Sequence, residues 1–277
     1  MSVHRCDIGP VRIGEGKLCL LAGPCMAESL ELCLTIAGSL QEICRRLDIG
    51  YVFKASFDKA NRSSVAGYRG PGLELGLQWL AQVRRELNVP VVTDVHEVAQ
   101  VRPVAQVVDC IQIPAFLCRQ TDLLVAAGET GKAVNVKKGQ FMAPWDMKQA
   151  VEKVNAAGNR NVLLTERGTM FGYNKLVTDF RGLVQMRQFA PVVFDATHSV
   201  MEPGALGGNA SGGQREYAPV LAAAAMAVGA DALFVETHVK PEQAKSDAAV
   251  QVPLSQMPAM LERCLALFRA ARDGGPG

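Results

Sequence analysis

The stretch Tyr51-Val-Phe-Lys-Ala-Ser-Phe-Asp-Lys-Ala-Asn-Arg-Ser-Ser64 joins a short apolar run to a strongly basic loop. Continuous apolarity without alternation is typical of a strand buried on both faces of a parallel sheet. The loop combines lysine point charges, an arginine fork and serine hydroxyls, which together suit the oxygens of a phosphate group. Taken alone, the loop fits a solvated basic turn at least as well, because most basic loops are surface features.

Seven further apolar runs resemble the first, and each is followed by a polar or glycine-bearing turn and then a helical segment. The eight runs are Leu18–Ala22, Tyr51–Lys54, Val89–Asp94, Cys110–Ile113, Ala133–Val136, Asn161–Thr165, Val192–Asp195 and Ala232–Glu236. Eight evenly spaced strand–helix units predict an α/β protein with a (β/α)8 TIM barrel. The alternative is a doubly wound open sheet. That fold usually has a glycine-rich dinucleotide loop after the first strand, and Ala22-Gly-Pro-Cys25 is not one.

The length of 277 residues, 49% of them hydrophobic, suits one large core. A single (β/α)8 barrel typically has ~250 residues. We therefore expect one domain over residues 1–277. Residues 1–17 predict a short N-terminal β-hairpin, with Val11-Arg-Ile13 as a strand and Gly14 to Gly16 as turn residues. Residues 273–277 are expected to form a loose tail.

The charge and cysteine patterns narrow the partners and the compartment. A net charge of +2 argues against a nucleic-acid or membrane partner, since those proteins usually carry a basic excess. Residues 1–17 lack the apolar core of a secretory signal, and the apolar segment 220–235 is too short to span a membrane. The eight cysteines show no paired spacing, which indicates reduced thiols. We expect a cytoplasmic protein.

The predicted strand ends carry reactive side chains. In a TIM barrel the active site lies at the carboxyl ends of the strands. Turn residues placed there by chance would more often be glycine, asparagine or serine. The residues found are Cys25, Lys54 with Lys59, Asp94 with His96, Gln112, Lys137, Arg167, His198, and Glu236 with His238. Their chemistry predicts one site built from all eight ends.

One subset of these residues is cationic: Lys54, Lys59, Arg62, Lys137 and Arg167. Facing one barrel mouth, these side chains would repel one another unless an anion balanced them, so we expect a ligand with several negative charges. A surface salt bridge is the ordinary interpretation of any single member. Convergence of the set on one face favours anion binding.

A second subset could bind a metal ion: Cys25, His198, Glu236 and Asp247. One thiolate with nitrogen and oxygen ligands suits Fe²⁺, Mn²⁺, Zn²⁺ or Co²⁺, and leaves room for water or substrate. The ligands form no short motif. From spacing alone, a core position for Cys25 and a hydrogen bond from His198 to phosphate fit the sequence as well.

Several longer motifs point to a known family. They are KASFDKANRSS at 54–64, TDVHE at 93–97, IQIPAFLCRQ at 111–120, VNVKKGQF at 134–141, TERG at 165–168, DATHSV at 195–200 and SGGQRE at 211–216. With these motifs the chain resembles the 3-deoxy-D-manno-octulosonate 8-phosphate synthase family from about Leu20 to Leu254. The related synthase of the seven-carbon aromatic precursor has a Lys-Pro-Arg-Thr-Ser pattern in place of the KANRSS loop.

The resemblance implies a transferase of lipopolysaccharide precursor synthesis, which condenses phosphoenolpyruvate with D-arabinose 5-phosphate and releases phosphate. The residues it implies for phosphoenolpyruvate are Lys54, Lys59, Lys137, Gln140 and Arg167. Those implied for the pentose phosphate are Asn61, Arg62 and Ser63, the last two reaching it across a subunit interface of a homotetramer. The residues that would shape the pocket are Asp94, Gln112, Pro114 and Phe116. The catalytic set would be Lys54, Lys59, Asp94, Lys137, His198 and Asp247.

The resemblance also bears on the metal. Members without a metal carry asparagine at the position of Cys25, whereas metal-requiring members are similar to this chain in AGPC and in Ser246-Asp247-Ala248. It therefore implies a divalent ion held by Cys25, His198, Glu236 and Asp247, acting as a Lewis acid. Either this ion or a side chain such as His198 or Asp94 would activate the water. The glycine-rich loop 201–213 could close over the site.

Two other functions fit the same residues. A Schiff-base phosphosugar aldolase would use Lys137 as its nucleophile, which requires a strongly depressed lysine pKa. A phosphosugar-binding barrel without catalysis would use the anion site alone. The complete set of implied ligands favours the synthase over both.

Overall fold

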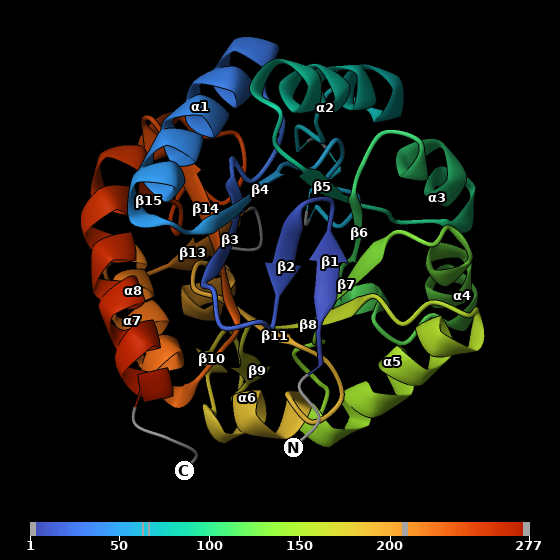
Figure 1. Cartoon of the computed structure of the whole chain (residues 1–277). Coiled ribbons are helices and arrows are strands. Elements are labelled where there is room, and N and C mark those ends of the chain that lie inside the picture. The colour runs from blue at the N-terminus through green and yellow to red at the C-terminus, as the bar shows by residue number, and fades with distance from the viewer. Residues whose placement is uncertain (1–3, 63, 66, 207–209, 274–277) are drawn as a thin grey trace.

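The computed structural model describes residues 4–62, 64–65, 67–206 and 210–273, and its centre is a closed parallel barrel (Figure 1). Within these residues eight parallel strands follow one another in chain order around the barrel, and pairing of β11 with β14 closes it. The strands are β3 (Cys19–Gly23), β4 (Gly50–Lys54), β5 (Val91–Asp94), β6 (Cys110–Ile113), β7 (Ala133–Lys137), β8 (Val162–Glu166), β11 (Val192–Asp195) and β14 (Ala232–His238). The predicted TIM barrel is confirmed.

The helices form a ring outside the barrel (Figure 1). They are α1 (Leu30–Leu47), α2 (Leu73–Leu87), α3 (Val98–Ala105), α4 (Thr121–Glu129), α5 (Met147–Ala156), α6 (Arg181–Met186), α7 (Ala218–Val228) and α8 (Met257–Asp273). Among the described helices, none has both the length and the apolarity needed to cross a membrane. The Ser29 hydroxyl accepts a hydrogen bond from Leu32 N and caps the start of α1.

The barrel strands separate two apolar clusters. In β4, Tyr51 and Phe53 pack in the outer cluster under the helices, whereas Val52 belongs to the inner cluster. The same alternation places Leu233 outside and Phe234 inside in β14. Because successive side chains point to opposite faces of a strand, continuous apolar runs fill both clusters.

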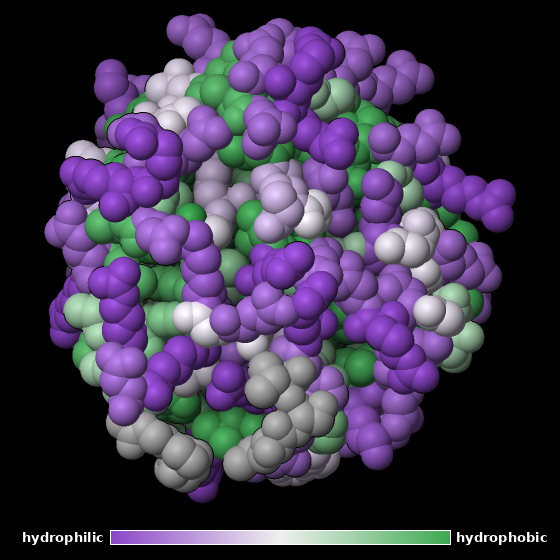
Figure 2. Space-filling view, viewed as in Figure 1, coloured by the Kyte–Doolittle hydropathy of each residue, from purple (hydrophilic) through white to green (hydrophobic). Residues whose placement is uncertain are grey.

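The N-terminal hairpin covers one end of the barrel. Its strands are β1 (Cys6–Ile8) and β2 (Val11–Ile13), and Ile8 and Ile13 pack in the inner cluster. Figure 1 shows the hairpin in front of the barrel, and Figure 2 shows that mainly polar side chains cover this face. The hairpin is confirmed, but its predicted turn is wrong. The strands are joined by Gly9-Pro10, with Gly9 at φ +56°, and Gly14–Gly16 instead lead into β3.

Short additional strands follow the carboxyl ends of the barrel strands. The strands are β9 (Thr169–Met170), β10 (Leu176–Val177), β12 (Met201–Leu206), β13 (Ala210–Gly213) and β15 (Val252–Pro253). The glycine-rich loop 201–213 therefore contains a hairpin, β12–β13. Asp273 was expected to begin a loose tail, and this is wrong, because it is the last residue of α8. Residues 274–277 lie outside the described part.

We predict that Ile8→Ala destabilises the protein, because it removes a fully buried side chain from the end of the inner cluster. Such truncations typically cost about 2–5 kcal/mol of unfolding free energy. Urea denaturation measures the effect. Arg12→Ala is the matched control, since Arg12 lies in the same hairpin with its side chain exposed. Equal stability of the two variants would show that the hairpin does not brace the barrel.

Candidate active site

The inner face of the barrel changes from apolar to polar toward the carboxyl ends of the strands. Val52 of β4 is followed two residues later by Lys54, and Phe234 of β14 by Glu236. Side chains two residues apart share a face, so both polar side chains point inward. In five further strands a buried polar side chain also lies two residues after an apolar residue of the inner cluster. These residues are Asp94, Gln112, Asn135, Thr165 and Asp195. The period of the strands therefore gathers four predicted site residues, Lys54, Asp94, Gln112 and Glu236, in one layer with three polar residues that were not predicted.

Two buried ion pairs cross this layer. Lys54 Nζ donates to Glu236 Oε1 at 2.8 Å, and Lys137 Nζ donates to Asp195 Oδ2 at 2.5 Å. Burial opposes the carboxylate charges, but nearby cations outweigh it. The pKa of Glu236 is held far below its usual range chiefly by Lys54, and that of Asp195 by His198 and Lys137. Both carboxylates are therefore ionised at neutral pH.

These pairs correct one part of the sequence argument. The cations were expected to repel one another unless a bound anion balanced them, and that is wrong as stated. Asp195, Glu236 and Asp94 lie among them and supply countercharge. The free protein can therefore hold the lysines together without a ligand.

Arg167 and Gln140 retain unused hydrogen-bonding groups. Both side chains are buried, at 5% and 3% exposure. Arg167 Nη1 and Gln140 Oε1 have no hydrogen-bond partner among the described residues, and Arg167 Nη2 contacts the Met201 sulfur at 3.8 Å. Burial lowers the pKa of Arg167 from its ordinary value, which reflects the cost of a guanidinium without a full set of partners. A buried guanidinium with a free N–H group is suited to receive an anion.

A group of metal-ligating atoms lies beside the Lys54–Glu236 pair. One ligand atom each from Cys25, Glu236 and Asp247 can be chosen so that all lie within 4.8 Å of one another. His198 Nε2 is 3.7 Å from Glu236 Oε2 and 3.9 Å from Asp247 Oδ2. Three of the four predicted ligands thus converge, and His198 lies beside two of them, Glu236 and Asp247, without belonging to the group of three.

The donor atoms of this group fit a divalent ion. Glu236 Oε2 is buried and has no hydrogen-bond partner among the described residues. His198 Nδ1 lies 2.6 Å from Asp195 Oδ2, which directs Nε2 toward Glu236 and Asp247. A ligating histidine held by a carboxylate in this way is common in metal sites. Burial raises the pKa of the Cys25 thiol, whose Sγ donates to Asp247 Oδ2 at 2.9 Å.

A hydrogen-bonded chain forms the neighbouring wall, next to Cys25, whose backbone oxygen accepts from Ser56 N at 3.3 Å. Lys59 Nζ donates to Ser56 Oγ at 3.0 Å, and Ser56 Oγ donates to Asp94 Oδ1 at 2.5 Å. The other carboxylate oxygen of Asp94 lies 3.0 Å from His96 Nε2. Burial opposes its charge, but His96 and Lys59 hold the pKa of Asp94 well below its usual range. Lys59 is therefore linked through the Ser56 hydroxyl to the Asp94 carboxylate.

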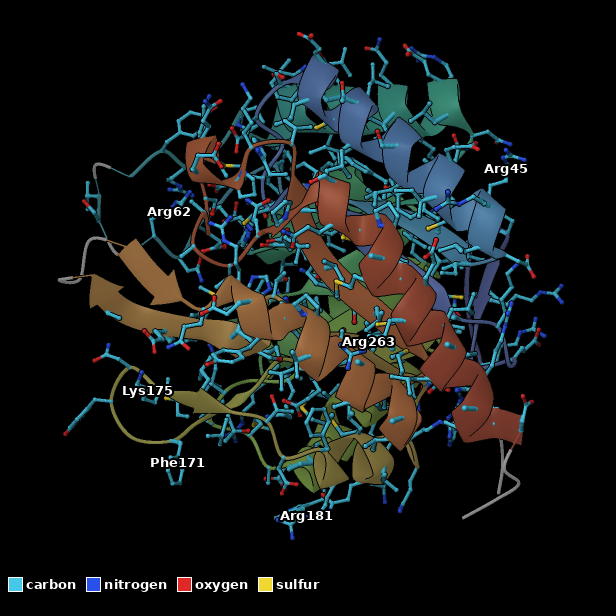
Figure 3. All side chains as sticks on the ribbon, turned by 90° about the vertical axis from the view of Figure 1, so that its left-hand side faces the viewer. Arg45, Arg62, Phe171, Lys175, Arg181 and Arg263 are labelled. Atoms are coloured by element: carbon cyan, nitrogen blue, oxygen red, sulfur yellow. The ribbon has the colours of Figure 1, made fainter. Side chains whose placement is uncertain are left out.

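The rim residues do not all join this buried set. Arg62 donates to Tyr68 O at 3.0 Å and to Lys245 O at 2.8 Å. Figure 3 shows Arg62 at the end of the barrel from which the β12–β13 hairpin projects. Asn61 and Phe116 are exposed, and Pro114 is half-buried. Ser63 lies outside the described residues.

Sequence reasoning missed Ser56 and Asp195, and named His96 without a role. A signal for Asp195 was present, because it is the last residue of a predicted buried strand and carries a charge. Ser56 had no such signal. Its hydroxyl matters only because the fold brings it between Lys59 and Asp94.

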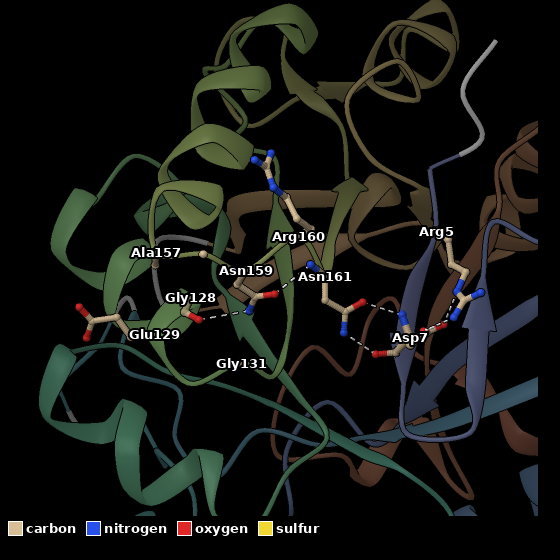
Figure 4. A pocket seen from close by; sticks show the side chains of 10 residues that line it. Arg5, Asp7, Gly128, Glu129, Gly131, Ala157, Asn159, Arg160 and Asn161 are labelled. Carbon is tan, nitrogen blue, oxygen red and sulfur yellow. Dashed lines mark hydrogen bonds and ion pairs between the residues drawn. The ribbon is translucent and has the colours of Figure 1, made fainter.

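A separate pocket of about 480 Å³ lies at the opposite end of the barrel (Figure 4). Its polar groups largely satisfy one another. Asp7 N donates to Asn161 Oδ1, Asn161 Nδ2 donates to Asp7 O, and Asn159 Nδ2 donates to Lys132 O. None of the predicted site residues lines this pocket, so its size does not make it the catalytic centre.

Comparisons with known proteins agree with the family resemblance that the sequence motifs indicated. The model of the DAHP synthetase I family matches residues 3–267. A protein of Cyanothece sp. named 2-dehydro-3-deoxyphosphooctonate aldolase is 58% identical over 260 residues, 93% of this chain and 95% of the relative. Relatives with the same name occur in Fusobacterium nucleatum, 54% identical over 94% of each chain, and in Chelativorans sp., 56% identical over 97% of this chain and 98% of the relative.

We predict that protonated His96 stabilises the fold. Burial lowers the pKa of His96, but Asp94 outweighs it and raises the pKa above the ordinary 6.5. The contribution is therefore complete below pH 6.5 and is lost as the pH rises through the folded pKa. The difference in unfolding free energy between wild type and His96→Gln should shrink over that interval in urea titrations. A constant difference at every pH would contradict this assignment.

Proposed function

This chain belongs to the DAHP synthetase I family, and we propose that within it the chain is a 3-deoxy-8-phosphooctulonate synthase, also named 2-dehydro-3-deoxyphosphooctonate aldolase. It condenses phosphoenolpyruvate with D-arabinose 5-phosphate and water. C3 of the enolpyruvate bonds to the aldehyde carbon, water adds at C2, and the C2–O bond to phosphate breaks. The products are 3-deoxy-D-manno-octulosonate 8-phosphate, a lipopolysaccharide precursor, and inorganic phosphate.

One observation carries this proposal: buried cations and a set of metal-ligating atoms meet at the same mouth of the barrel. Phosphoenolpyruvate brings a carboxylate and a phosphate. Arg167 receives this ligand through its free N–H group, and Gln140 adds an amide beside it. Lys54, Lys59 and Lys137 supply the remaining positive charge. Fixed cations of this kind also stabilise negative charge that develops on the departing phosphate.

The second substrate occupies the wall formed by Asp94, Gln112, Pro114 and Phe116. The Asp94 carboxylate is ionised and fixed by Ser56 and His96, so it can accept hydrogen bonds from sugar hydroxyls. Asn61, Arg62 and Ser63 bind the pentose phosphate at the rim. For this role Arg62 would exchange its contact with Lys245 O for a phosphate oxygen.

Cys25, His198, Glu236 and Asp247 would hold a divalent ion, of the Fe²⁺, Mn²⁺, Zn²⁺ or Co²⁺ type. When bound, such an ion supplies Lewis acidity at the aldehyde group of the sugar. The Asp195 carboxylate fixes His198 from the other side of the ring, and Lys54 fixes Glu236. These residues keep the ligand atoms in place before the substrates arrive.

The chain is further proposed to work as one domain in a cytoplasmic homotetramer, with Arg62 and Ser63 near a subunit interface. Exposed apolar side chains on successive loops support assembly, namely Phe116, Phe141, Trp145, Met170 and Phe171. Large apolar side chains that are exposed in one chain become buried when that face packs against another subunit. The eight cysteines are free, which supports a reducing compartment.

A Schiff-base aldolase that uses Lys137 is the second candidate. Burial lowers the pKa of Lys137, which is the direction this mechanism requires. However, Lys137 Nζ lies 2.5 Å from the ionised Asp195, which favours the ammonium form. Lys137 is therefore better suited to bind an anion than to attack a carbonyl.

We predict that the protein releases inorganic phosphate only when phosphoenolpyruvate and D-arabinose 5-phosphate are both present. A chelator should abolish release and added Mn²⁺ should restore it, because the ligand set fits a divalent ion. A phosphate assay measures both effects. No release in any metal state would refute the synthase, whereas chelator-resistant release would refute only the metal requirement.

Borohydride added during turnover should leave Lys137 unmodified; a trapped adduct would support the Schiff-base alternative.

We predict that Cys25→Asn loses its bound metal, because asparagine cannot supply the thiolate. Wild type should carry about one ion per chain, as expected for a mononuclear site. Elemental analysis of purified protein measures this content. Cys264→Ala is the control, since Cys264 is a buried thiol on α8 outside the ligand group. Full metal content in Cys25→Asn would show that the ligand is misassigned.

A further inference from the structure

The loop that carries Asp247 is held by hydrogen bonds to five consecutive backbone carbonyls. The donor pairs are Arg62 Nη2 to Lys245 O (2.8 Å), Gln251 Nε2 to Ser246 O (2.8 Å), Val250 N to Asp247 O (3.0 Å), Arg215 Nη2 to Ala248 O (2.6 Å) and Arg215 Nε to Ala249 O (3.3 Å). Contacts within the loop therefore act together with two side chains from other parts of the chain, Arg62 and Arg215, to set its position.

Asp247 itself has an unfavourable backbone conformation. Its φ is +48°, in the left-handed region that residues other than glycine rarely adopt. Such a conformation persists only where the surroundings enforce it. In this conformation Asp247 Oδ2 lies 2.9 Å from Cys25 Sγ and 3.9 Å from His198 Nε2. Release of the loop would let the carboxylate leave the ligand group.

Arg215 makes two of these five contacts. It lies two residues after the end of β13, in the short helix Arg215–Tyr217, and is half-buried. Among the described residues, no carboxylate lies within ion-pair distance of its guanidinium. The planar fork instead spans the carbonyls of Ala248 and Ala249, a geometry that a lysine cannot reproduce.

We propose that Arg215 is a positioning residue, which holds Asp247 in the conformation needed to bind the divalent ion. Gln251 supports the same loop from within the protein, where it is fully buried. The inference rests on the proposed metal site, and it adds a residue that contacts neither ion nor substrate. Residues that orient a metal ligand typically contribute 10–100-fold to metal affinity, so the effect is measurable without turnover.

The test is a Co²⁺ titration of metal-free protein, followed by the thiolate-to-cobalt absorption band. Arg215→Ala should weaken Co²⁺ binding by about 10-fold and alter the band, because Asp247 is no longer held. Arg215→Lys keeps the charge but loses the fork, and should fall between that variant and wild type. Arg45→Ala should bind as wild type does. Arg45 is exposed on α1 and bonds to Glu42, so this variant controls for the loss of one arginine.

Unchanged Co²⁺ affinity and an unchanged band in both Arg215 variants would overturn the proposal. If Arg215→Ala does not fold, Arg215→Lys decides the question by itself. A wild type that fails to bind Co²⁺ also overturns it. Phosphate release by wild type is measured separately. Wild type that binds Co²⁺ but releases no phosphate refutes the synthase and leaves the positioning role of Arg215 to be decided by the titration.

Discussion

The buried ion pair between Lys54 and Glu236 is the interaction on which the site depends. It joins β4 to β14 across β3, and neither side chain has significant contact with solvent. Loss of one partner from such a pair typically costs about 3–5 kcal/mol, because the other charge is left uncompensated. Lys54 Nζ also donates to Cys25 O at 3.1 Å. One ammonium group therefore fixes the carboxylate of one proposed metal ligand and the backbone of another.

The remaining charges of the site follow the same principle. Lys137 is balanced by Asp195, which also orients His198, and Lys59 is tied through Ser56 to Asp94. Each cation that serves the proposed anion site is thus linked to a group that serves the metal or the sugar. Arg167 is the exception, with a guanidinium N–H that no described residue accepts. The site is organised before substrate arrives, and Arg167 marks the place left for it.

Much of this arrangement could be predicted from particular residues. The eight apolar runs gave the strands to within two residues of their observed starts, and the rule for barrel strand ends selected Lys54, Asp94, Lys137, His198 and Glu236. The prediction of mutual repulsion among the cations failed because Asp94 and Glu236 were assigned to the sugar and the metal, and Asp195 to a strand, so none of them was counted as countercharge to the lysines. The turn of the N-terminal hairpin was misplaced because Gly9-Pro10 and Gly14–Gly16 offer similar turn chemistry.

The sequence by itself determined the barrel, the inward face of each strand and the kinds of chemistry at the strand ends. These follow from local rules, since burial on both faces requires apolar runs and a period of two fixes which side chains point inward. Only the tertiary structure decided the pairings: Lys54 with Glu236, Ser56 between Lys59 and Asp94, and Arg215 on the Asp247 loop. Such contacts depend on strand register and loop conformation, which bring together residues that are up to 182 positions apart and that no local pattern connects.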